Sequence, residues 1–274
     1  STSLLAIRLS GKCGEKLQQF LEYIKQAPDR GTQLSGLIFN HSNFTSNELE
    51  GISNFISYAN VRSIGFNSAI ENDSMPDFYS SFLTPKVTDQ LLCLNLDGTH
   101  NLDLDKIFPR LRKVALLSLE NCNLNILKVF QLLNTYSVSM SQLRMINLSQ
   151  NLIQIDEDLS EFPSLDSKLP SRLTGFVMNG ITWVNTLKSF FEFIFSHVDS
   201  KLKLSLSDAD ENEQQWQELF ELFGESEYGG FSELIWDNNP INENLFSLLE
   251  KSQNMIRLQV NGCFTSKMEN EVNS

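Results

Sequence analysis

The sequence predicts an α/β solenoid, in which short parallel strands stack side by side and helices cover one face of the resulting sheet. Two observations support this prediction. A short segment of alternating apolar residues recurs ten times, and its central residue returns every 23 to 30 residues. Most of these segments are followed by apolar residues at the spacing of a helix with one buried face. Repeats of this length are typical of arrays in which each unit buries its apolar face against its neighbours.

The clearest copy of the segment is 143–153, which reads LRMINLSQNLI and fits the pattern L-x-x-L-x-L-x-x-N-x-L without a mismatch. Ile146 and Leu148 alternate as in a strand with one buried face. Asn151 lies where the chain leaves that strand, and its amide can bond to backbone groups that the turn leaves unpaired. This is the leucine-rich repeat consensus. It predicts a curved horseshoe of about ten repeats, with a parallel β-sheet on the concave face and helices on the convex face.

The central apolar residues fix the expected register of the sheet. In chain order they are Ile7, Leu37, Ile64, Leu94, Leu117, Ile146, Phe176, Leu204, Leu234 and Leu258. The eighth repeat allows two phases, because Leu202, Leu204 and Leu206 all alternate with polar residues.

The helices of the first half follow from apolar spacing. A first helix is expected around 17–24 and a second around 49–56, opened by the capping box of Thr45 and Glu48. The third outer segment is turn-rich over 71–76, with a short helix over 78–83. In the fourth, Pro109 limits any helix between 103 and 111.

The second half continues the same plan. Helices are expected around 126–133, 187–198, 216–223 and 245–249, whereas Pro163 and Pro170 predict a loop or one short turn after the sixth strand. In the helix of the seventh repeat, Leu187, Phe190, Phe191, Ile194 and Val198 form the inward stripe. Phe193 and Phe195 fall beside this stripe, where they either seal the gaps between adjacent helices or form an exposed contact patch.

Composition bounds the cellular setting and the class of partner. Four cysteines lie far apart without a C-x-x-C pair, which favours reduced thiols and a cytoplasmic location. No apolar run is long enough for a membrane span. The net charge of −13 divides into −1 for residues 1–137 and −12 for 138–274. A chain this acidic is a poor nucleic-acid binder, because phosphate contacts need basic side chains.

The most acidic stretch, residues 208–250, holds twelve acids and no Lys or Arg. It is either a solvated face or a docking surface for a partner protein with a basic surface.

The position of Asn151 is polar in most but not all repeats. Across the ten repeats it is occupied by Lys12, Ser42, Ala69, Thr99, Cys122, Asn151, Ile181, Ala209, Asn239 and Cys263. A small buried polar side chain there can still reach the turn backbone, which gives Cys122 and Cys263 a structural role. Ala69, Ile181 and Ala209 interrupt this ladder, so we expect its hydrogen bonding to be intermittent.

Two residues earlier, every repeat carries a polar side chain at the end of its strand. From this column, and from the acidic stretch, the candidate partner-binding residues are Asn40, Asn67, Asp97, Glu120, Asp208 and Asp237. Alternatively, these side chains simply start the turn, for which Asn, Asp and Ser are favoured. The solvent-facing column within the strands has no continuous charge or aromatic ridge, so it indicates no particular ligand.

No motif for covalent chemistry is present. The three histidines His41, His100 and His197 fall on distant repeats, which a one-dimensional stack does not bring together. Phosphate-binding glycine loops, zinc-binding His motifs and nucleophile elbows are missing from the sequence. We therefore expect no catalytic, cofactor-binding or metal-binding residues, no cofactor and no enzyme activity.

Three segments carry a resemblance to known families, namely 94–98 (LNLDG), 146–151 (INLSQN) and 234–241 (LIWDNNPI). They resemble the ribonuclease-inhibitor-like class of leucine-rich repeat proteins over essentially the whole chain. Endings such as 236–240 (WDNNP) are similar to the repeat domain of CARMIL-type regulators of actin capping protein. That resemblance implies a scaffold that forms a homodimer. The capping-protein-binding segment of that family lies outside its repeats, so no family residue is carried over.

The sequence thus predicts a non-catalytic scaffold for protein partners in actin-cytoskeleton or signalling regulation, with residues 1–274 forming one solenoid within a longer chain. Two alternatives stay open. One is a GTPase-activating protein of the RanGAP type, although Arg8, Arg62 and Arg144 fall on strands and not on protruding loops. The other is the ligand-sensing repeat domain of an immune receptor.

Overall fold

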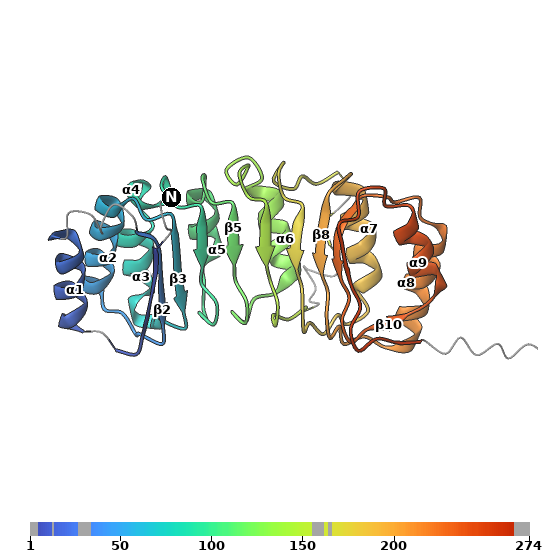
Figure 1. Cartoon of the computed structure of the whole chain (residues 1–274), viewed down its shortest axis with the longest axis horizontal. Helices are drawn as coiled ribbons and strands as arrows, with labels where there is room; N and C mark the ends of the chain where they lie inside the picture. Colours follow the sequence, from blue (N-terminus) through green and yellow to red (C-terminus); the bar gives the residue numbers. More distant parts are fainter. Residues whose placement is uncertain (1–4, 13, 27–33, 155–161, 164–165, 266–274) are drawn as a thin grey trace, which may run out of the picture.

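The computed structural model describes residues 5–12, 14–26, 34–154, 162–163 and 166–265. Ten strands form one parallel sheet in the order in which they occur along the chain. The strands follow one another along the molecule, with helices on one side of the sheet (Figure 1). The leucine-rich repeat solenoid predicted from the sequence is confirmed. The sheet strands are β1 (Leu5–Ser10), β2 (Leu34–Asn40), β3 (Ser63–Asn67), β4 (Cys93–Asn95), β5 (Leu116–Ser118), β6 (Met145–Asn147), β7 (Gly175–Val177), β8 (Leu202–Ser205), β9 (Phe231–Ile235) and β11 (Arg257–Gln259).

The register of the sheet matches the predicted one in every repeat. Ile7 pairs with Leu37, Ile146 with Phe176, and Leu234 with Leu258, as do the central residues between them. In the eighth repeat the central residue is Leu204, opposite Phe176 and Leu234. The alternation of apolar residues fixes this register, because a shift by one residue would turn every buried side chain to solvent.

Helices of varied length cover the other face of the sheet. They are α1 (Glu15–Gln26), α2 (Ser46–Ala59), η2 (Asn72–Ser74), α3 (Met75–Asp77), η3 (Phe78–Phe82), α4 (Pro85–Thr88), α5 (Leu104–Ile107), η4 (Phe108–Arg110), α6 (Ile126–Thr135), α7 (Leu187–His197), α8 (Glu213–Glu225) and α9 (Glu243–Glu250). A small second sheet pairs β10 (Pro240–Ile241) with β12 (Phe264–Thr265). The capping interaction at α2 is present, since the Glu48 carboxylate accepts from both N–H and Oγ of Thr45 at 2.8 Å.

The third outer segment is predicted to be turn-rich over 71–76 with a short helix over 78–83. The helix is confirmed by η3, but most of the turn-rich part is helical as well, so that part of the prediction is wrong. Residues 72–82 form successive short helical turns, η2, α3 and η3. Pro76 does not interrupt them, because it stands at the start of α3, where its missing N–H has no helical partner to lose. The predicted limit that Pro109 sets on any helix between 103 and 111 is confirmed, since α5 has only four residues and η4 only three. Of the expected loop after β6, residues 155–161 and 164–165 lie outside the described residues.

A left-handed turn follows the strand end in all ten repeats of the described chain. The residues with positive φ at this position are Gly11, His41, Ser68, Gly98, Asn121, Gln150, Gly180, Asp208, Asn238 and Gly262. Each of the first nine donates its backbone N–H to the carbonyl of the following repeat, as Gln150 does to Asn179 at 2.8 Å. Parallel pairing therefore extends past the strand ends to the turn.

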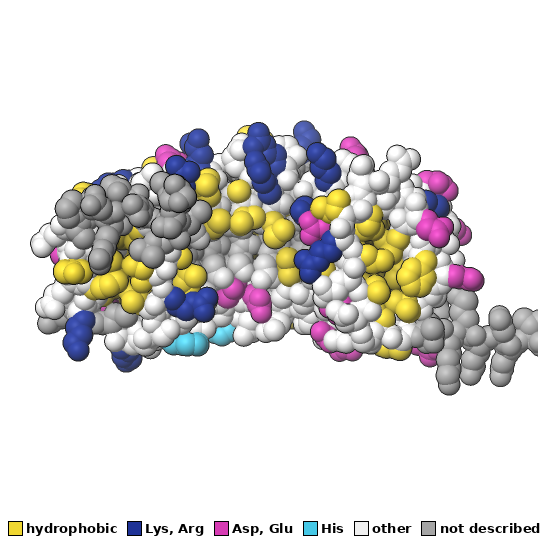
Figure 2. All heavy atoms as spheres, in the orientation of Figure 1, with side chains coloured by type: hydrophobic (Ala, Val, Ile, Leu, Met, Phe, Trp, Pro, Cys, Tyr) yellow, Lys and Arg dark blue, Asp and Glu magenta, His cyan; other side chains and the backbone are white. Residues whose placement is uncertain are grey.

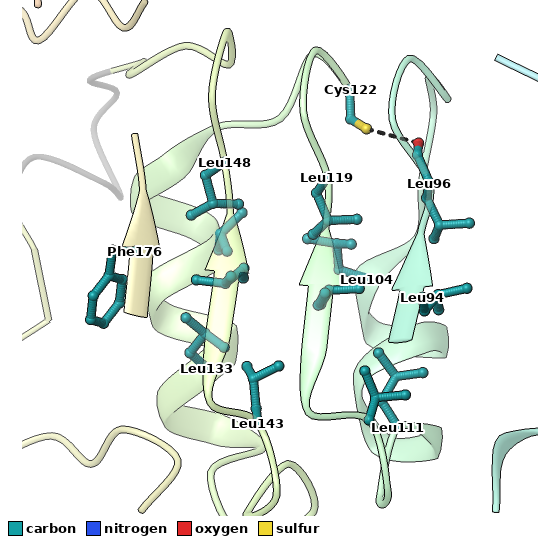
Figure 3. Packing of buried hydrophobic residues seen from close by; sticks show 14 of the residues in the cluster. Leu94, Leu96, Leu104, Leu111, Leu119, Cys122, Leu133, Leu143, Leu148 and Phe176 are labelled. Carbon is teal, nitrogen blue, oxygen red and sulfur yellow. Dashed lines mark hydrogen bonds between the residues drawn. The ribbon is translucent and has the colours of Figure 1, made fainter. Parts of the chain in front are cut away.

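The core is a continuous row of buried side chains between sheet and helices. Leu96, Leu119 and Leu148 of three neighbouring repeats lie side by side in one row (Figure 3). Phe193 is 2% exposed and packs edge-on against Phe130, with ring centroids 5.5 Å apart. Phe195 stacks on Tyr228 at 4.2 Å. Phe193 thus fills the gap between α6 and α7, and Phe195 fills the gap between α7 and the loop after α8, as the first of the two predictions requires.

None of the helices in the described residues is both long enough and apolar enough to cross a membrane.

Candidate functional site

The exposed face of the sheet contains a hollow of about 410 Å³ over its first seven strands. Small residues make room for it, among them Ser63 and Gly65 of β3. Apolar side chains stand around this space, and Leu116 at the start of β5 keeps 43% of its surface exposed. The hollow is lined by Arg8, Ile38, Ser63, Ile64, Gly65, Asn67, Cys93, Leu94, Asn95, Leu116, Leu117, Ser118, Met145, Asn147 and Val177.

Most of the predicted partner-binding residues lie along the edge of this face where the strands end. Asn67 donates Nδ2–H to Oδ1 of Asn40 at 3.0 Å, joining β3 to β2. The Asp97 carboxylate accepts from Oγ of Ser118 at 2.6 Å and from the backbone N–H of Glu120 at 2.8 Å. Glu120 in turn accepts from Nδ2 of Asn147 at 3.0 Å. The structure brings Asn40 and Asn67 together, and separately Asp97 and Glu120.

Asp237 occupies the equivalent place in the ninth repeat, far along the sheet from Asp97. Its carboxylate accepts from the backbone N–H of Asn261 at 2.7 Å and from Nε2 of Gln259 at 2.6 Å. Desolvation opposes the charge on this group, but these hydrogen bonds outweigh it and hold the pKa of Asp237 below its ordinary value. Asp208 belongs to the eighth repeat and stands one position after the strand-end position, in the left-handed turn. Its carboxylate accepts from Nδ2 of Asn238 at 2.8 Å.

Within the described residues, the carboxylates of Asp97 and Glu120 are held by hydrogen bonds and not by ion pairs. In the part of the chain that the structure describes, neither forms an ion pair. Their bonds instead come from neutral amides, hydroxyls and backbone N–H groups, which hold the two carboxylates in place. We call this pair the acidic edge.

The opposite edge, where the strands begin, is basic. Exposed Lys or Arg side chains stand in the residues that lead into β3, β5, β6, β7 and β8, and none forms an ion pair with a described carboxylate. Because the strands are parallel, these residues share one edge. We call it the basic edge and define it as Arg62, Arg112, Lys113, Arg144, Arg172 and Lys201. Figure 2 shows Lys and Arg side chains along the upper edge of the molecule and Asp and Glu side chains below its middle, with further Lys or Arg side chains to the lower left of that acidic patch.

Sequence reasoning missed the basic edge and the hollow. The basic residues stand two to five positions before the central apolar residue, so they do not form one column in an alignment of repeats. The hollow depends on which small residue of one strand stands beside which large residue of the next. One signal in the sequence could have indicated the hollow: Cys93, Leu116 and Met145, the first residues of β4, β5 and β6, are apolar at a position that faces solvent.

The position of Asn151 holds the turns together, as predicted. Asn151 donates Nδ2–H to the carbonyls of Leu119 at 2.7 Å and Leu148 at 2.9 Å, and its Oδ1 accepts from the N–H groups of Cys122 and Leu124, each at 3.0 Å. The same bond to the preceding repeat is made by Thr99, Cys122, Asn239 and Cys263.

Cys122 is a structural thiol. Its Sγ lies 3.2 Å from the Leu96 carbonyl (Figure 3). Burial raises the pKa of this thiol to about 12, which is the opposite of the shift that activates a nucleophile. Among the described residues, no three His, Cys, Asp or Glu side chains are grouped so that they could hold a metal ion.

Comparison with known proteins gives an architectural likeness alone. No protein-family model and no curated protein matches the chain. Among solved structures, the chain is similar to one in a crystal structure of a TLR13–ssRNA13 complex, with 14% sequence identity and a TM-score of 0.42 over 95% of this chain. This chain spans 29% of the length of that one. The likeness is too distant to transfer a residue role or a ligand.

Proposed function

We propose that this chain is a non-catalytic protein-interaction domain that binds its partner on the exposed face of the sheet. The observation that carries the proposal is the hollow of about 410 Å³, with its exposed apolar side chains, on a sheet whose other face packs against helices. An exposed apolar patch rimmed by polar residues is typical of an interaction surface. The hydrogen bonds along the acidic edge support this role, because a partner then meets side chains that are already ordered.

The finer form of the proposal is a scaffold in actin-cytoskeleton or signalling regulation. Its support is the sequence resemblance of segments such as 236–240 to CARMIL-type repeat domains. In this form the candidate residues Asn40, Asn67, Asp97 and Glu120 border the bound partner, whereas Asp208 and Asp237 contact it further along the sheet.

A photo-crosslinking experiment tests where the partner binds. A photoreactive phenylalanine analogue replaces Leu116 in the hollow or, as the control, Phe246 on α9, which is similarly exposed at 41%. After irradiation in cell extract, we expect discrete protein adducts from position 116 and few from position 246. Adducts from position 246 alone would contradict binding on the sheet face.

A further inference from the structure

Two edges of opposite charge flank the hollow, and neither is neutralised within the described residues. Arg62, Arg112, Lys113, Arg144 and Arg172 lead into the strands that cross the hollow, and Asp97 and Glu120 follow two of those strands. A partner lying across the strands therefore meets positive charge on one flank and negative charge on the other. Complementary charges at such edges orient a partner and exclude wrong ones.

The centre of the hollow is apolar. Ile38, Leu116, Met145 and Val177 reach it from four strands, and Gly175 leaves space beside Met145 because a side chain there would lie 3.1 Å from Met145 Cβ. Burying the exposed part of Leu116 is favourable by roughly 25 cal/mol per Å² of apolar surface. The partner must accordingly present an apolar row between its two charged flanks.

The hollow offers little to pair with an exposed peptide backbone. Several of its polar side chains are already bonded to one another, whereas Oδ1 of Asn67 has no hydrogen-bond partner among the described residues. Asn147 donates to Ser118 and Glu120, each at 3.0 Å, and Asn95 donates to Asp97 at 2.6 Å while accepting from the Asp97 N–H. The sheet face presents side chains and not backbone groups. A segment buried here must satisfy its own N–H and C=O groups, and an α-helix does so.

The dimensions suit a helix. Strands lie about 4.8 Å apart, so β3 to β7 span roughly 19 Å, the length of about 13 helical residues at 1.5 Å each. The register sets Arg62 level with Leu92 and Arg144 level with Ala115, so each lies five residues before the level of Asp97 or Glu120. At 3.3 Å per residue this separation is about 17 Å, which admits a helix about 10–12 Å wide.

We propose that the hollow seats an amphipathic α-helix of a partner protein, lying across β3–β7 with acidic side chains toward the basic edge and basic side chains toward Asp97 and Glu120. This deepens the proposed function and rests on it. A single-stranded nucleic acid would match the basic edge but would place phosphates beside the acidic edge, so the charges favour the helix.

The experiment selects helices against the purified chain. A phage library displays a rigid helical scaffold with one face randomised, and binders are collected on the wild-type protein. We expect the selected helices to carry an apolar row, with Asp or Glu on one flank and Lys or Arg on the other. The Kd of each selected helix is then measured for Leu116→Asp, with Phe246→Asp as the control of similar exposure. It is also measured for the double variant Arg62→Glu/Arg144→Glu, with Lys128→Glu on α6 as the control charge reversal. Thermal midpoints verify that each variant is folded.

The proposal predicts that Leu116→Asp weakens binding more than tenfold, in the manner of an apolar anchor, and that the double reversal weakens it by about tenfold. The controls leave Kd unchanged. Suppose that selected helices lose affinity for Leu116→Asp but carry no consistent charges on their two flanks, or that they bind the double charge reversal as tightly as wild type. Either result overturns the proposed helix orientation without contradicting the proposed function. Binders unaffected by Leu116→Asp, or a selection that yields none, overturn both. Tight binding of poly(U) RNA, lost in the double reversal, overturns the helix in favour of a nucleic acid.

Discussion

At the scale of single residues, Asn151 shows why one amide can matter to a repeat protein. Its side chain bonds to backbone groups of its own turn and of the preceding repeat, at distances of 2.7 to 3.0 Å. These groups lie at a turn buried between repeats, where water cannot replace the bonds. The side chain is 5% exposed, so its removal leaves those groups unpaired.

Replacing Asn151 with Ala is expected to lower the free energy of unfolding by about 1–3 kcal/mol, the cost of stranding buried backbone groups. Chemical denaturation measures the change. Asn54→Ala, on the exposed face of α2, is the matched control and should leave the midpoint almost unmoved. An equal shift for both variants would mean that the ladder position is not special.

Asp237 gives a pH-dependent prediction. Hydrogen bonds lower its pKa in the folded state, so its charged form stabilises the fold above the ordinary aspartate pKa of about 3.9. This contribution disappears as pH falls from that value through the lowered folded pKa. Asp237→Asn should therefore be less stable than wild type at pH 7, and the difference in stability should be smaller at pH 3. Denaturation midpoints that differ by the same amount at both pH values would be inconsistent with this view.

At the scale of elements, the strands were predictable because each has one buried face, and the choice of Ile7, Leu117 or Leu258 as central residue follows from that alternation. The left-handed turns were not recognised, since the ten positions hold residues as different as Gly11, His41 and Asp208. What they share is a backbone angle, which a side-chain pattern does not display. The helical turns at 72–82 were underestimated for a related reason, because Pro76 reads as a breaker unless its place at a helix start is known.

Gly180 isolates the effect of the left-handed turn. Its φ is +63°, and a Cβ there would meet nothing closer than Gln150 Cγ at 3.6 Å, so substitution brings no clash. Gly180→Val should cost about 1–2 kcal/mol through the backbone alone. Gly180→Asn should cost less, as Asn already occupies this turn at Asn121 and Asn238. Equal denaturation midpoints for the two variants would contradict a role for the turn angle.

Phe193 tests the seal between adjacent repeats. Its ring is 2% exposed and lies against Phe130 and Phe162. Phe193→Ala is expected to cost about 3–5 kcal/mol because it opens a cavity. Phe246→Ala on α9, where the ring is 41% exposed, should cost far less. If Phe193→Ala lowers the denaturation midpoint no more than the control does, Phe193 does not seal this gap, and the alternative prediction of a surface contact is favoured.

At the scale of the whole molecule, stacking repeats turns small local choices into one extended surface. A lone Arg before one strand is an ordinary exposed side chain, but parallel strands place Arg62, Arg144 and Arg172 on a common edge. The solenoid and its register were predictable because they repeat. The hollow and its two edges were not, because they arise from differences between repeats, such as Gly65 beside Asn95 and Ser118 beside Asn147.

The most direct test of the account is a double-mutant cycle between this surface and a selected helix. Arg144→Glu in the protein and Glu→Lys at the facing position of the helix should each weaken binding at low salt, and the two together should restore most of it, because opposite charges face each other again. The restored fraction should shrink as salt rises. Losses that simply add, with no recovery in the double variant, would contradict the claim that the charged edges of this face orient its partner.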